Sequence, residues 1–98
     1  MVIHYTVYIL FSEKLNRFYT GYTSNLDIRI DFHLNSLPNK FTANAKDWKL
    51  FFKLECDSKQ QALKIEKHIK RMRSKIYIQN LVLYPEVSDK LLNLYMDC

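Results

Sequence analysis

The sequence predicts an α+β fold, with a small three-stranded, largely antiparallel sheet flanked by helices in the order β-β-α-β-α-α-α. Three observations support this. The chain has 98 residues, which is the size of one domain. Hydrophobic residues make up 48% of it, enough for a single core. Its strand-like segments are β-branched and aromatic, whereas the second half of the chain is dominated by patterns of helical period.

The first two strands are predicted to form a hairpin. Residues 3–11 alternate along a β-branched and aromatic segment, residues 12–16 are polar and short, and residues 17–22 return. Tyr8 and Tyr19 would face each other across this hairpin, depending on its register. A third strand, rich in aromatic residues, is expected at residues 48–56.

A helix follows the hairpin, with Ser24 or Asn25 as its N-cap and Pro38 marking its end. Residues 39–47 have no clear period and are expected to form a loop. Ser58 and Gln61 match a capping box at the start of a second helix. The apolar stripe predicted for that helix contains Ala62, Ile65, Ile69 and Met72.

A short third helix is expected to start at Ser74 or Lys75 and to run through Leu83, and Pro85 fits the first turn of a last helix. The inward residues predicted for the last helix are Val87, Leu91, Leu94 and Tyr95. We therefore expect one domain over residues 1–98, in which residues 84–98 are a C-terminal helical extension.

The charge favours an anionic partner, most often nucleic acid. The net charge is +5, and residues 59–75 contain seven Lys or Arg and one acid. The cations expected to contact nucleic acid are Lys40, Lys67, Lys70, Arg71 and Arg73. The alternative is a solvated helix face, with Lys40 in a mobile loop.

The sequence also indicates the cellular compartment of the protein. No signal peptide is visible, and no apolar run reaches the ~18 residues that a membrane span needs. The two cysteines, Cys56 and Cys98, do not have the spacing of metal ligands. We expect free thiols in a reducing cytoplasm and no membrane association.

Glu66 is the most informative single residue. It lies about 40° from Ala62 and about 60° from Ile69 on a helical wheel, and so borders the buried stripe of a basic helix. A carboxylate in that position needs a partner. Two interpretations are open: an ion pair with a cation such as Lys67, Lys70 or Arg29, or an oxygen ligand for a hard divalent cation such as Mg²⁺.

Three other residues have weaker signals. Arg29 and His33 are four apart and share a helix face, which suits either packing or a phosphate-binding guanidinium beside a titratable imidazole. Gly21, the only glycine, lies inside a predicted strand, where glycine often marks a close backbone approach.

The order of these motifs resembles one known family. The motifs are Val7-Tyr8-Ile9-Leu10, Tyr19-Thr20-Gly21-Tyr22-Thr23, Leu26-x-x-Arg29-x-x-x-His33, and Glu66 within Ala62-Leu63-Lys64-Ile65-Glu66-Lys67. Over about residues 3 to 80 the chain resembles the GIY-YIG nuclease superfamily. It looks most like the small, single-domain bacterial branch related to the N-terminal nuclease module of the excision-repair subunit UvrC. It departs from the pattern at Thr6-Val7-Tyr8, where the family has Gly-Ile-Tyr, and at Tyr22.

The resemblance implies a metal-dependent endonuclease that hydrolyses phosphodiester bonds in DNA, including branched or damaged DNA, in repair or DNA processing. It implies that Glu66 binds one Mg²⁺ or Mn²⁺ and that Tyr8 helps to activate the attacking water, as general base or by relay. Tyr19 would orient the phosphate or a metal-bound water. Arg29 would stabilise charge on the phosphate, and His33 would assist proton transfer.

Two other functions are compatible with the sequence. One is a nucleic-acid-binding module of the same fold with weak or no turnover. The other is an interaction subunit whose acidic, apolar C-terminal segment docks a protein partner, which would then supply specificity.

Overall fold

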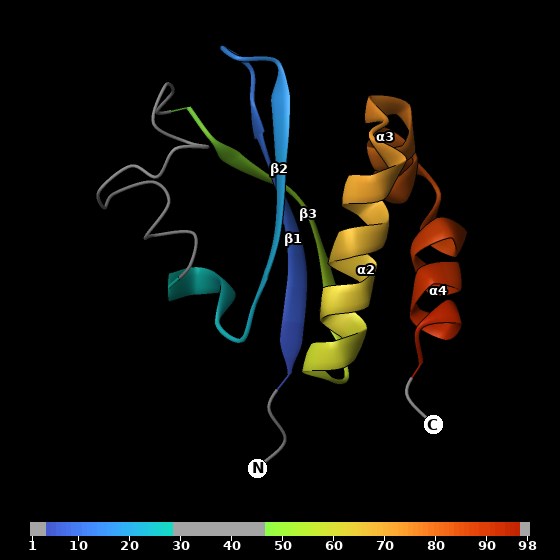
Figure 1. Cartoon of the computed structure of the whole chain (residues 1–98). Coiled ribbons are helices and arrows are strands. Elements are labelled where there is room, and N and C mark those ends of the chain that lie inside the picture. The colour runs from blue at the N-terminus through green and yellow to red at the C-terminus, as the bar shows by residue number, and fades with distance from the viewer. Residues whose placement is uncertain (1–3, 29–46, 97–98) are drawn as a thin grey trace.

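A computed structural model of the chain describes residues 4–28 and 47–96 (Figure 1). Its centre is an antiparallel sheet with the strand order β2-β1-β3. The strands are β1 (Tyr5–Ser12), β2 (Arg17–Thr23) and β3 (Lys49–Cys56). The predicted α+β class, the hairpin and the third strand are confirmed, and both strand pairs are fully antiparallel.

β1 is buried on both of its faces, because four consecutive residues, 7–10, are almost inaccessible. Val7 and Ile9 point to one face, where they pack with residues of helices α2 (Lys59–Met72), α3 (Lys75–Leu83) and α4 (Pro85–Leu94). Tyr8 and Leu10 point to the other face and form a second cluster with Trp48. Figure 1 shows α2 against the sheet and α4 on the far side of α2.

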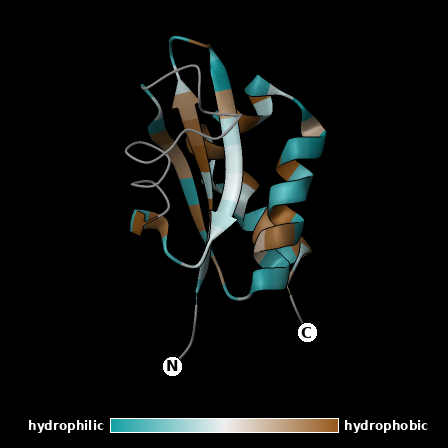
Figure 2. Ribbon diagram, turned by 60° about the vertical axis from the view of Figure 1, so that its left-hand side comes forward, coloured by the Kyte–Doolittle hydropathy of each residue, from teal (hydrophilic) through white to brown (hydrophobic). Residues whose placement is uncertain are grey.

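β2 is one of the two edge strands of the described sheet. It pairs only with β1 among the described strands, and its Tyr, Thr and Gly residues give it an intermediate hydropathy, so that it is drawn almost white in Figure 2. β1 is more hydrophobic, as expected for the central strand. An edge strand leaves one side of its backbone and side chains accessible to a ligand.

Side-chain caps fix where α2 begins. The Ser58 hydroxyl accepts a hydrogen bond from the Gln61 N–H at 3.1 Å, as predicted. The Gln61 carboxamide accepts from the Asp57 N–H at 2.7 Å, one residue before the position that a capping box uses. Gln61 also donates to the Leu92 carbonyl at 3.0 Å, which joins α2 to α4.

Two residues predicted to be buried are exposed. Met72 is 46% exposed at the last residue of α2, next to the C-cap Arg73, whereas Ile69 in the same turn is buried. Leu94 is 64% exposed at the end of α4. Leu91 and Tyr95 face inward as predicted. Leu91 is buried, and the Tyr95 hydroxyl lies 2.9 Å from His68 Nδ1 on α2.

Asn25 begins the helix that follows the hairpin, because its side-chain oxygen accepts a hydrogen bond from the Ile28 N–H at 3.2 Å. This confirms one of the two predicted N-caps. The remainder of that helix and the loop predicted at residues 39–47 fall largely outside the described residues.

Asp47 holds the turn between β1 and β2. Its carboxylate accepts hydrogen bonds from the Ser12 hydroxyl at 2.7 Å and from the Lys14 N–H at 2.9 Å. Both bonds lower the pKa of Asp47 below 3.8, and the bond from the Lys14 backbone has the larger effect. The first two strands are thereby fixed to the start of β3.

Asp47→Ala is expected to destabilise the protein at neutral pH. The pKa of Asp47 is lower in the folded protein than its value of 3.8 in the unfolded chain. The carboxylate therefore stabilises the fold fully at pH values above 3.8, and this stabilisation is lost as the pH falls through the lower, folded pKa. The melting temperatures of the wild type and the variant should therefore differ at pH 7 and converge at acidic pH. A difference that does not change with pH would contradict this role.

Cys56 is a free, buried thiol, as predicted. Burial, together with the neighbouring Asp57 carboxylate, raises its pKa to about 11. The thiol therefore stays protonated at neutral pH and acts as a small core residue.

Candidate active site at the edge of the sheet

Tyr8 and Gly21 form one unit across the hairpin. They are direct partners in the β1–β2 register, and the Tyr8 side chain lies over Gly21. A Cβ added to Gly21 would stand 2.6 Å from Tyr8 Oη and 2.7 Å from Tyr8 Cζ. Gly21 is thus required for a close approach, as predicted, but the group that approaches is the phenol of Tyr8, which is 1% exposed.

Tyr19 lies diagonally across from Tyr8 on the same face of the sheet. Leu10 is its direct partner, and the two tyrosine rings are 6.4 Å apart between centroids with a tilt of 38°. Diagonal pairs on one sheet face are within reach of aromatic side chains. The two tyrosines therefore share one face of the hairpin, but they are diagonal neighbours and do not face each other directly, because the register pairs Tyr8 with Gly21.

Glu66 is buried on α2, which packs on the opposite face of the sheet from the two tyrosines. Its Oε1 lies 2.8 Å from Lys70 Nζ, and the two side chains are 11% and 53% exposed respectively. The ion pair is one of the two interpretations of Glu66 that the sequence left open. Because the lysine is half exposed, its ammonium can turn to solvent at little cost.

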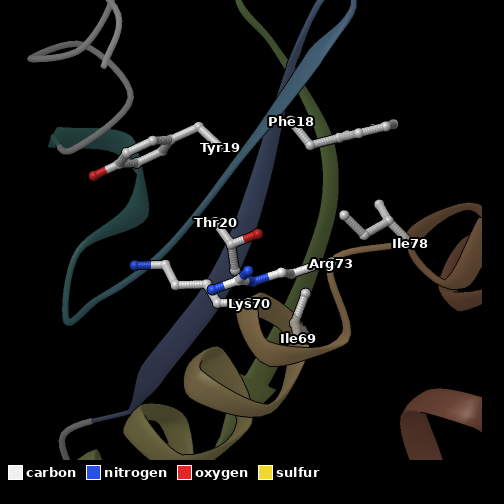
Figure 3. A pocket seen from close by; sticks show the side chains of 7 residues that line it. All are labelled: Phe18, Tyr19, Thr20, Ile69, Lys70, Arg73 and Ile78. Carbon is white, nitrogen blue, oxygen red and sulfur yellow. The ribbon is translucent and has the colours of Figure 1, made fainter. Parts of the chain in front are cut away.

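Lys70 connects the glutamate to the hairpin. It lines a pocket of about 310 Å³ together with Tyr19 and Thr20 of β2. The complete lining is Phe18, Tyr19, Thr20, Ile69, Lys70, Arg73 and Ile78 (Figure 3). Tyr19 and Lys70 thus line one pocket at the edge of β2, and Glu66 adjoins it through its ion pair with Lys70, whereas Tyr8 is buried behind Gly21 and is not part of the lining.

The predicted nucleic-acid contacts divide into two groups. Lys70 and Arg73 line the pocket, and Figure 3 shows both side chains extending toward the side on which the Tyr19 ring lies. Lys67 and Arg71 are exposed elsewhere on α2 and are not part of the pocket lining. Arg29, His33 and Lys40, which were also predicted, lie outside the described residues.

Arg73 has an unusual backbone. It is the C-cap of α2 and adopts the left-handed conformation, with φ 48° and ψ 39°. Glycine is the usual residue there, because a Cβ in this conformation costs about 1–2 kcal/mol. An arginine that bears this cost beside a pocket suggests a function for its guanidinium.

Arg73→Gly is expected to raise the free energy of unfolding by up to about 1 kcal/mol, because glycine relieves the strained backbone. The same variant should bind DNA more weakly, because a cation is lost from the pocket. Arg73→Lys is the matched control, since it keeps both the charge and the strain. Chemical denaturation and DNA titration measure the two effects; weaker folding of Arg73→Gly, or unchanged binding, would contradict the assignment.

The apolar part of the pocket was not foreseen as functional. Phe18, Ile69 and Ile78 come from β2, α2 and α3, and Ile69 was predicted only as a core residue. Their sequence signal is that of ordinary packing, so only the fold reveals the hollow. Tyr22, which departs from the family pattern, packs against the core on the α2 face and not with the other two tyrosines.

The donor chemistry is compatible with one divalent cation. Within residues 4–28 and 47–96 no three His, Cys, Asp or Glu side chains gather where they could hold a metal. Mg²⁺, however, often takes only one or two carboxylates and keeps several waters for a phosphate substrate. Glu66, with a partner that can move away, meets this requirement.

A family model described as the GIY-YIG catalytic domain matches residues 4–79 of the chain. The chain therefore belongs to the GIY-YIG family. Its catalytic domain is a phosphodiesterase-type nuclease domain, which implies a nucleic-acid substrate, and nucleases of this family generally use a divalent metal. No curated protein and no solved structure matches the chain significantly.

The helices in the described part of the chain are too short or too polar to cross a membrane.

Proposed function

We propose that the chain is a metal-dependent endonuclease that hydrolyses phosphodiester bonds in DNA, with Glu66 as the ligand of one Mg²⁺ or Mn²⁺. The observation that carries this proposal is a buried carboxylate, Glu66, whose cationic partner among the described residues, Lys70, lines the same pocket as Tyr19. A bound metal would supply charge stabilisation at the phosphate and a more acidic water.

Other side chains of the protein would orient the attacking water, position the phosphate and transfer a proton. Tyr8, held over Gly21, orients the attacking water through its hydroxyl. Tyr19 and Lys70 position the phosphate from two sides. Arg29 would add a guanidinium on the phosphate oxygens, and His33 would move a proton. Pre-positioned donors of this kind stabilise the charge that develops in the transition state.

A cleavage assay tests the proposal. Supercoiled plasmid and branched DNA are incubated with the full chain in Mg²⁺, in Mn²⁺ and in EDTA. We expect cutting that requires the metal. The proposal fails if no form of DNA or RNA is cut under any of these conditions.

One observation favours a second function, a binding module without turnover. The Glu66 carboxylate is paired with Lys70, and a pair that never opens would leave no ligand for a metal. In that case Lys67→Ala and Arg71→Ala should each flatten the salt dependence of DNA binding by about one unit, while no hydrolysis occurs. Metal-dependent cutting would exclude this alternative.

We also propose a biological setting. The chain would act in the bacterial cytoplasm, in DNA repair or processing, as a member of the single-domain branch related to the UvrC module. Its domain would span residues 1–98, with residues 84–98 extending the family unit; the family match ends at residue 79, and α4 is joined to α2. A protein partner would supply specificity. A deletion strain that survives DNA damage as well as its parent would contradict the role in repair.

A further inference from the structure

The pocket beside Tyr19 is built from two kinds of surface. Its floor is apolar, formed by Phe18, Ile69 and Ile78, while Lys70 and Arg73 place two positive charges at its rim. A site for phosphate alone needs no apolar floor, and a purely apolar ligand needs no cations. The combination fits a ligand with a flat apolar part attached to an anion.

The floor is held in place before any ligand arrives. The Phe18 ring packs against Phe11 and Phe51, with centroids 4.7 Å and 4.9 Å away. A register shift in β3 opposite Ile9 and Leu10 accompanies this aromatic cluster. Phe18 thus has fixed neighbours on the strand side while it lines the pocket from β2.

The far wall is fixed as well. Lys75, at the start of α3, donates a hydrogen bond from Nζ to the Asn16 carbonyl in the hairpin turn at 2.7 Å. Ile78 follows one turn later on α3 and is 8% exposed. This bond links the hairpin turn to the start of α3, the two elements that supply Phe18 and Ile78 to the pocket, and a hollow formed before binding takes up a ligand with less loss of entropy.

A nucleotide has the matching chemistry, because it joins a planar base to a phosphate. A paired nucleotide in a duplex cannot use the pocket, since its base is stacked inside the helix and only its backbone is presented. An unpaired nucleotide can place its base on the apolar floor and its phosphate between the two cations. Stacking on an aromatic ring is favourable for every base and needs no sequence code.

We propose that this pocket binds one unpaired nucleotide of the substrate strand, next to the phosphate that lies at Glu66 and Tyr19. The inference rests on the proposed nuclease function and adds the substrate class to it. The enzyme selects DNA with an unpaired nucleotide beside the scissile phosphate, such as a flap, a gap or a branch. Its selectivity is for DNA structure and not for base sequence.

The test uses two matched DNA probes and the full chain in EDTA, so that no strand is cut. One probe is a 2-aminopurine-labelled duplex, and the other is the same duplex with the labelled nucleotide unpaired at a flap. The wild type should bind the flap at least about fivefold more tightly and change its fluorescence. Phe18→Leu should reduce this preference to within about twofold, with little effect on duplex binding.

Phe51→Leu is the matched control. It removes the same ring from the same aromatic cluster, but Phe51 does not line the pocket. This variant should keep the preference for the flap, whatever its loss of thermal stability. Equal binding of both probes by the wild type, or equal loss in the two variants, would overturn the proposal.

Cleavage by the same preparations separates this inference from the nuclease function. If DNA is cut in a Glu66-dependent way without any preference for unpaired nucleotides, the nuclease function stands and the pocket assignment is wrong. If the preference is present and lost in Phe18→Leu but nothing is cut, the pocket assignment stands and the nuclease function is wrong.

Discussion

Glu66→Gln is expected to lower the rate of DNA cleavage by about a thousandfold or more, because it removes the carboxylate that we propose as the metal ligand. The amide keeps the shape of the side chain but has no charge to attract a divalent cation. Single-turnover cleavage at saturating enzyme measures the chemical step without a contribution from DNA binding.

A matched control shows whether the effect depends on the position of the carboxylate or only on replacing a glutamate by a glutamine. Glu55→Gln makes the same substitution at an exposed residue of β3 and should leave the cleavage rate unchanged. Glu66→Gln should also unfold at nearly the wild-type temperature, since Lys70 is half exposed and can be solvated without its partner. A Glu66→Gln protein that cuts DNA within about tenfold of the wild-type rate would remove Glu66 from the site.

Gly21→Ala is expected to reduce both stability and activity. The added Cβ would lie 2.6 Å from Tyr8 Oη and 2.7 Å from Cζ, so the ring must move. Tyr8 is almost completely buried, and its displacement should cost about 1–3 kcal/mol of unfolding free energy. Because the hydroxyl moves with the ring, we expect cleavage to fall by about a hundredfold as well.

A double-mutant cycle identifies the cause. In a Tyr8→Ala background the ring is absent, and Gly21→Ala should then be nearly neutral for stability. Denaturant unfolding of the four proteins gives the coupling energy directly. If Gly21→Ala destabilises both backgrounds equally, glycine is required for its backbone and not for the room it leaves to Tyr8.

Most of the fold could be predicted from the sequence, because local signals agree with the final structure. The hairpin follows from its β-branched and aromatic segments, and α2 begins where Ser58 and Gln61 predict it. The errors fall at the ends of helices. Met72 and Leu94 fit the apolar spacing of their helices, but each lies beyond the part of the helix that a neighbouring element covers. The spacing alone does not show where that cover ends.

The candidate site could be predicted only in part. Glu66 is recognisable because a buried acid on a basic helix requires a cation, but whether that cation is Lys70 depends on geometry. The pairing of Tyr8 with Gly21 depends on a register that a one-residue shift would change. The pocket depends on three separate elements, so its residues have no common sequence signal.

The most direct test of the central claim, that Glu66 exchanges its lysine for a metal ion, is anomalous diffraction from crystals of the full chain soaked in Mn²⁺. We predict a manganese peak within about 2.3 Å of a Glu66 carboxylate oxygen, with the Lys70 ammonium turned away from it. Soaked crystals in which Lys70 still pairs with Glu66, and in which manganese is bound elsewhere or nowhere, would contradict the claim.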